Sequence, residues 1–165
     1  MVGGAWKKPR ENSIEALLYG MEHADGVEMD LRLTADGEVV IHHDPRTSGG
    51  LYPESSDYSE IAEYSDRFED LLSKEEFTSR WVDEGRFVCL ELKAPHPSSG
   101  SGGGWFRGEP MRRHMSELMQ KVREMIEHEG VPLSSTVFYS FDPVITKVAE
   151  MHSGDYRHAR LMPKL

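Results

Sequence analysis

The stretch 26-GVEMDLRLTADGEVVIHHD-44 alternates charged and apolar residues and then ends in two histidines and an aspartate. Its charged residues Glu28, Asp30 and Arg32 occupy every second position. The apolar residues beside them are Val27, Met29, Leu31 and Leu33. Because successive side chains of a strand point to opposite faces, this period of two predicts a strand over 27–33 with one charged face.

A second strand is predicted over 38–43, after the turn signal Thr-Ala-Asp-Gly at 34–37. A parallel crossover needs roughly a dozen residues, far more than this turn provides. The two strands should therefore form an antiparallel hairpin.

The register of this hairpin would bring a histidine close to two carboxylates. We expect Glu28 to lie across from His43 and Asp30 from Ile41, with side chains that share a face. A register shifted by one residue would place His42 where His43 is expected. The histidine that faces the carboxylates is thus His43 or His42.

The remaining elements follow from helical spacing, caps and turn residues. Asn12 and Glu15 resemble a capping box, so we begin a helix at Asn12 and extend it over 12–24. The later predictions are a long loop over 45–66, a helix over 68–84, a strand over 86–93, a flexible loop or linker over 98–104, a helix over 110–129, a strand over 136–141, a helix over 142–151 and a strand over 159–163. This alternation predicts α/β layering in a single domain, residues 1–165.

Composition and charge narrow the class of protein. The net charge is −10 without a basic block, so nucleic acid and anionic membrane surfaces are not expected partners. No run approaches the ~20 apolar residues of a membrane-spanning helix. The single cysteine, Cys89, excludes an internal disulfide, and with no visible signal peptide it favours a cytoplasmic location. The sequence leaves the oligomeric state open.

A second pair of charges extends the candidate site. Glu91 and Lys93, in Leu-Glu-Leu-Lys at 90–93, also share a strand face. Together with Glu28, Asp30 and a histidine, they would suit a hard divalent cation, Mg²⁺ or Ca²⁺, and a phosphate ester. The lysine would hold an anionic oxygen and the histidine would move a proton.

Purely structural interpretations fit the same patterns. An amphipathic hairpin with one solvated face alternates in the same way, and Glu91 with Lys93 could be a cross-strand ion pair. Cys89 fits a small buried side chain. The methionine-rich face of the helix over 110–129 fits core packing. We expect solvent exposure for the histidines at 23, 114, 128, 152 and 158.

Several motifs in order resemble the glycerophosphodiester phosphodiesterase family. Residues 9–44 are similar to its N-terminal signature, which runs Pro-Glu-Asn-Thr, a helix, Glu-x-Asp, an Asp-Gly turn, a hydrophobic run and His-Asp. Residues 90–93 resemble its Glu-Leu-Lys motif, and Ser-Phe-Asp-Pro at 140–143 resembles its Ser-Phe-Asp motif. The resemblance is dense over 9–44 and sparse afterwards.

The resemblance implies a role for each matching residue. The implied metal ligands are Glu28, Asp30 and Glu91. His43, which is followed by Asp44, would be one of two acid–base histidines. Lys93 would contact the phosphate as a catalytic residue. Glu11 and Asn12 match the Glu-Asn pair, with Arg10 inserted before them, and Glu11 would bind substrate.

The resemblance also implies a fold and a reaction. The implied fold is α/β, a TIM (β/α)8-type barrel of the phospholipase-C-like phosphodiesterase kind. The implied reaction is metal-dependent hydrolysis of a small-molecule glycerophosphodiester to glycerol 3-phosphate and an alcohol. Two alternatives share the motifs: a non-catalytic member that binds metal or phosphate, and a sphingomyelinase D-like lyase.

Two departures from the family pattern modify these expectations. The family begins with His-Arg-Gly, and alignment on Gly3 places Met1 and Val2 at the His and Arg positions. A full barrel takes about 250 residues, or 200 at the low end. We therefore expect an incomplete barrel of about five strands, without the family's first, seventh and eighth strands, and impaired hydrolysis.

Overall fold

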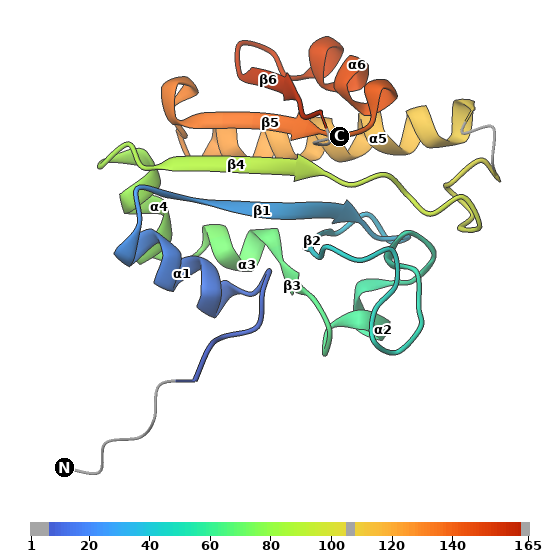
Figure 1. The fold of residues 1–165 in the computed structure, drawn as a ribbon, viewed down its shortest axis with the longest axis horizontal. Coiled ribbons are helices and arrows are strands. Elements are labelled where there is room, and N and C mark those ends of the chain that lie inside the picture. Colours follow the sequence, from blue (N-terminus) through green and yellow to red (C-terminus); the bar gives the residue numbers. More distant parts are fainter. Residues whose placement is uncertain (1–6, 105–107, 163–165) are drawn as a thin grey trace.

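A computed structural model describes residues 7–104 and 108–162 and shows one open sheet with helices packed along it (Figure 1). The strand order is β3-β2-β1-β4-β5-β6. The strands are β1 (Gly26–Leu33), β2 (Val39–Ile41), β3 (Asp66–Arg67), β4 (Phe87–Leu92), β5 (Thr136–Ser140) and β6 (Arg157–Arg160). Strands β1, β4, β5 and β6 are parallel neighbours, whereas β1 pairs antiparallel with β2. The predicted hairpin is confirmed.

Helix α1 precedes β1, and the other helices lie in connections between strands. They are α1 (Ile14–His23), α2 (Tyr58–Ile61), α3 (Phe68–Leu72), α4 (Glu75–Val82), α5 (Glu109–His128) and α6 (Pro143–His152), with 3-10 turns η1 (Pro53–Ser55) and η3 (Leu133–Ser135). Asp142 caps α6 by accepting from the Val144 amide at 2.8 Å. Among the described residues, no helix is long and apolar enough to span a membrane.

Three predicted elements were wrong in detail. Helix α1 is capped by Ser13, whose hydroxyl accepts from the Ala16 amide, and not by Asn12. The predicted helix over 68–84 is two helices in the structure, because α3 ends at its C-cap, Ser73, before α4 begins. The predicted loop over 45–66 contains η1 and α2 and runs into β3, a strand that the sequence pattern missed.

The register of the hairpin is shifted by one residue from the expected one. Leu31 pairs with Ile41, so Asp30 lies beside His42, whose amide donates to the Asp30 carbonyl at 2.9 Å. The shift arises because Glu38 belongs to the turn: its carbonyl accepts from the Thr34 amide at 2.9 Å. The expected pairing of Glu28 with His43 was therefore wrong.

The two faces of the sheet differ sharply. The apolar residues of β1 pack with the methionine-rich face of α5 in one core. The members on α5 are Met111, Met115, Leu118, Met119, Val122 and Ile126, all fully buried. The opposite face carries the charged residues of β1, and apolar side chains remain exposed at the ends of the neighbouring strands, such as Phe87 and Phe141. We call this second face the inner face.

His114 is the exception among histidines that were expected to be solvated. It is 8% exposed on α5, and its Nε2 has no hydrogen-bond partner among the described residues. Burial, reinforced by the charge of Arg32, lowers the pKa of His114 to about 4. Folding therefore favours the neutral form of the His114 imidazole.

His114 should make the fold sensitive to mild acid. Its pKa falls on folding, so its contribution to stability is complete above about pH 6.5 and is lost as the pH falls towards about 4. Between about pH 7.5 and about pH 5, this one group should remove about 2 kcal/mol of unfolding free energy. Urea denaturation of wild type and His114→Leu at both pH values measures the difference. An equal loss in the two proteins would contradict the assignment.

Candidate functional site

Three carboxylates converge on the inner face, where the middle of β1 lies beside the C-terminal part of β4. The parallel register pairs Asp30 with Glu91, and Glu28 lies two residues earlier on the same face of β1. One oxygen from each of the three lies within 4.8 Å of the others. The structure thus brings together the three predicted metal ligands. We call them the acidic cluster, and we call the strand ends with their following loops the mouth.

Lys93 compensates part of the negative charge of this cluster. Its Nζ donates to Glu91 Oε1 at 2.7 Å and lies 3.0 Å from Asp30 Oδ1. Both carboxylates are buried, so their mutual repulsion is weakly screened and the ammonium stabilises them. Lys93 lies where the sequence prediction placed it, two residues after Glu91 on the same face.

Asn12 holds Asp30 from the other side, a role that helix-cap reasoning missed. Its Nδ2 donates to Asp30 Oδ2 at 2.7 Å, and its Oδ1 accepts from the Asp30 amide at 2.9 Å. Asn12 adopts φ 52°, a left-handed conformation that asparagine tolerates better than most residues. The match of Asn12 to the family's Glu-Asn pair was the sequence signal that pointed to it.

Tyr139 on β5 completes the surroundings of the cluster and was missed altogether. Its hydroxyl donates to Glu28 Oε1 at 2.7 Å. Burial raises the pKa of the Glu28 carboxyl and the charges of Asp30 and Glu91 raise it further, whereas the Tyr139 hydrogen bond opposes them. Burial and the Glu28 carboxylate raise the pKa of Tyr139, so its hydroxyl stays protonated and remains a donor.

The two adjacent histidines have different environments. The His42 ring is half-buried, with Nδ1 3.0 Å from the Ser65 hydroxyl, and burial lowers its pKa. The His43 ring is exposed, with Nδ1 2.9 Å from Asp44 Oδ1. Of the two histidines, His43 is therefore the one whose ring a ligand at the mouth can contact.

A hollow of about 330 Å³ opens at the mouth. His43, Glu91, Lys93 and Phe141 all line it, so the predicted proton-transfer and phosphate-binding residues share one cavity with part of the acidic cluster. Glu11 lies elsewhere: it is exposed, pairs with Lys8 at 2.9 Å, and lines a separate polar hollow that also reaches His43. Its predicted contact with substrate stays a prediction.

The chemistry of the acidic cluster fits a divalent cation. Asp30 Oδ1 is buried and accepts no hydrogen bond from any described residue, although Lys93 lies nearby. A buried carboxylate oxygen that accepts no hydrogen bond and lies close to two further carboxylates is a favourable place for a hard cation, which prefers oxygen ligands. Glu28, Asp30 and Glu91 would hold it. Among the described residues, no other group of acidic, histidine or cysteine side chains is similarly arranged.

Arg32 fastens the loops that surround the mouth. Its guanidinium is 3% exposed and donates to Glu54 Oε1 at 2.6 Å. It also donates to the carbonyls of His42, His43 and Ala94, at 3.2, 2.8 and 3.0 Å. One side chain of β1 therefore joins three segments: the loop after β2 that carries His42 and His43, which we call the histidine loop, η1, and the segment after β4.

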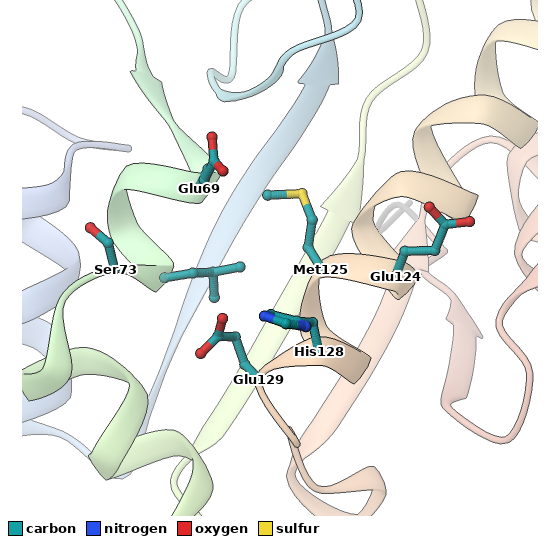
Figure 2. A pocket seen from close by; sticks show the side chains of 7 residues that line it. Glu69, Ser73, Glu124, Met125, His128 and Glu129 are labelled. Carbon is teal, nitrogen blue, oxygen red and sulfur yellow. The ribbon is translucent and has the colours of Figure 1, made fainter.

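A further hollow lies on the helical side of the sheet (Figure 2). It has a volume of about 470 Å³ and lies between α3 and the C-terminal part of α5. Leu72 and Met125 line it together with the side chains Glu69, Ser73, Glu124, His128 and Glu129. None of these residues belongs to the acidic cluster.

Comparison with protein families finds one match. The sequence model of the glycerophosphoryl diester phosphodiesterase family matches residues 3–91, which include the acidic cluster and both histidines. No curated protein matches the chain.

Several solved structures with the same fold are distant in sequence from this chain. A glycerophosphodiester phosphodiesterase from Parabacteroides distasonis is 19% identical, with a TM-score of 0.71 over 98% of this chain and 62% of that one. One from Thermotoga maritima is 21% identical, with a TM-score of 0.65 over 95% and 58%. A phosphodiesterase from Oleispira antarctica in complex with sn-glycerol-3-phosphate is 18% identical, with a TM-score of 0.65 over 92% and 60%.

These likenesses establish the fold class. The chain spans about three-fifths of the length of the solved structures that it matches. Its sheet stays open between the edge strands β3 and β6. The expected fold, an incomplete TIM (β/α)8-type barrel, is confirmed.

Removal of Arg32 should destabilise the chain far more than joint removal of the ion pair. Arg32→Met leaves the Glu54 carboxyl buried without its cation, which typically costs about 3–5 kcal/mol of unfolding free energy. Arg32→Met with Glu54→Met replaces both charges with apolar side chains and should cost less than the single change. Urea denaturation measures both. A double variant less stable than Arg32→Met would show that the ion pair is not the main contribution.

Proposed function

The chain belongs to the glycerophosphoryl diester phosphodiesterase family, and from that premise we propose that it is a metal-dependent phosphodiester hydrolase. The proposed substrate is a small glycerophosphodiester, cleaved to glycerol 3-phosphate and an alcohol. One observation carries the proposal: His43 and Lys93 line a single hollow at the mouth together with Glu91, a member of the acidic cluster. That combination suits a phosphate ester, which needs charge neutralisation and proton transfer at one place.

The residues of the mouth divide the chemistry between them. A divalent cation on Glu28, Asp30 and Glu91, Mg²⁺ or Ca²⁺, would supply Lewis-acid stabilisation of the phosphoryl oxygens. Lys93 is close enough to bind an anionic oxygen beside the cluster. His43 moves a proton to or from the reacting oxygen, and Asp44 orients its ring through Nδ1.

The charge of the chain makes a local positive centre necessary. At a net charge of −10, the long-range field opposes an anionic diester. The neighbour from Oleispira antarctica was solved with sn-glycerol-3-phosphate, which supports a small-molecule substrate of this type. We place the reaction in the cytoplasm, in line with the single cysteine.

We also propose that hydrolysis by this 165-residue chain is weak. The partner histidine and the phosphate-binding arginine implied by the family resemblance align with Met1 and Val2, which lie outside the described residues. Neither side chain can exchange a proton near neutral pH or carry a charge. Loss of one general acid–base group costs roughly 10²–10⁴-fold in rate.

Divalent cation should raise the melting temperature of the wild-type chain. A ligand that binds only the folded state stabilises it, by about 1.4 kcal/mol at roughly ten times its dissociation constant. Glu28→Gln removes one charged ligand and should abolish most of the shift. The control is Glu22→Gln, an exposed carboxylate on α1, which should keep it. Identical melting curves with and without millimolar Mg²⁺ or Ca²⁺ would count against the metal site.

Hydrolysis of glycerophosphocholine should be slow and should depend on His43. We expect His43→Ala to lower the rate by roughly 10²–10⁴-fold. Met1→His with Val2→Arg, in a chain extended at its N-terminus, should raise the rate. An enzymatic assay for glycerol 3-phosphate measures the rate of wild type, of His43→Ala and of the extended double variant.

The products of this assay separate the alternatives. A cyclic phosphate in place of glycerol 3-phosphate would indicate the lyase reaction. Robust turnover by the wild type that survives His43→Ala would show that the proton-transfer role belongs to another residue.

A further inference from the structure

Each carboxylate of the acidic cluster has one oxygen held by a donor from the chain. Glu28 Oε1 accepts from the Tyr139 hydroxyl at 2.7 Å. Asp30 Oδ2 accepts from Asn12 at 2.7 Å, and Glu91 Oε1 accepts from Lys93 at 2.7 Å. Among the described residues, no hydrogen bond is formed by the second oxygen of any of the three carboxylates, although Asp30 Oδ1 lies 3.0 Å from the Lys93 ammonium. The cluster therefore presents at most one oxygen per carboxylate.

The number of available oxygens bears on the choice of cation. Ca²⁺ takes about 6–8 oxygen ligands in flexible geometry and is often bound by both oxygens of a carboxylate. Mg²⁺ takes about six in a near-octahedral arrangement and keeps several waters. Carboxylates that each give at most one oxygen leave room for the waters that Mg²⁺ keeps, and they do not supply the bidentate carboxylate that often binds Ca²⁺.

The geometry points to Tyr139 as a positioning residue that makes this site selective for Mg²⁺ over Ca²⁺. This inference rests on the proposed function, because it concerns the same metal site. Of the three donors, Tyr139 is the one whose hydrogen bond can be removed with the fewest other effects. Asn12 also binds the Asp30 amide, and Lys93 carries a charge that the buried carboxylates need, whereas Tyr139 binds Glu28 through a neutral hydroxyl alone.

The placement of Tyr139 is built into the sheet. It pairs with Glu91 in the parallel register of β4 and β5, so its side chain lies on the inner face beside the cluster. Glu28 is the most exposed member of the cluster and the one that Lys93 does not contact. Without the Tyr139 hydroxyl, the Glu28 carboxylate could turn and give both oxygens to a larger cation.

The test compares cation affinities of wild type, Tyr139→Phe and the control Tyr19→Phe, an exposed tyrosine on α1. Isothermal titration calorimetry with MgCl₂ and with CaCl₂ gives the dissociation constants. We expect wild type to bind Mg²⁺ more tightly than Ca²⁺. Tyr139→Phe should weaken Mg²⁺ binding by about 10-fold or more, as loss of a hydrogen bond to a ligand typically does, with a smaller change for Ca²⁺. Tyr19→Phe should match wild type.

The outcomes separate this inference from the proposed function. Wild type that binds neither cation would overturn the metal site itself and the selectivity with it. Wild type that prefers Ca²⁺, or a Tyr139→Phe protein with an unchanged affinity ratio, would overturn the role of Tyr139 alone. Circular dichroism and the melting temperature without cation verify that Tyr139→Phe is folded; if it is not, the preference of the wild type decides.

Discussion

The buried guanidinium of Arg32 is the constraint on which the mouth depends. A charge removed from water is costly unless its donors are matched, and here a carboxylate and three backbone carbonyls match them. Those acceptors belong to η1, the histidine loop and the segment after β4. Because the network is satisfied only when all three segments are in place, the loop that carries His43 is held against the ends of the strands.

The acidic cluster shows how a stable fold can hold three mutually repelling carboxylates close together. Three carboxylates on one face would repel one another, and two of them are buried. The chain offsets this with Lys93, which contacts Glu91 and Asp30, and with the neutral donors Asn12 and Tyr139, which bind Asp30 and Glu28. The apolar core on the other side of the sheet holds the strands in register, so stability and site chemistry are assigned to opposite faces.

Much of the site was predictable because strand periodicity is local. Alternation placed Glu28 and Asp30 on one face, as it did Glu91 and Lys93, and the chemistry of a metal and phosphate site, supported by the family resemblance, joined the two pairs. The hairpin register was off by one residue, since Glu38 lies in the turn and not in the strand. The choice between His42 and His43 depended on that register and on the position of Ser65, which periodicity does not determine.

The sequence by itself determined the α/β class, the hairpin, the apolar face of α5 and the residue types of the cluster, because each depends on neighbours within a few turns or strand residues. The tertiary structure alone decided how those residues meet. Tyr139 reaches Glu28 across 111 positions of chain, and Arg32 reaches Ala94 across 62. Such contacts arise from the order of parallel strands, which is set by packing of the whole sheet and has no local pattern in the sequence.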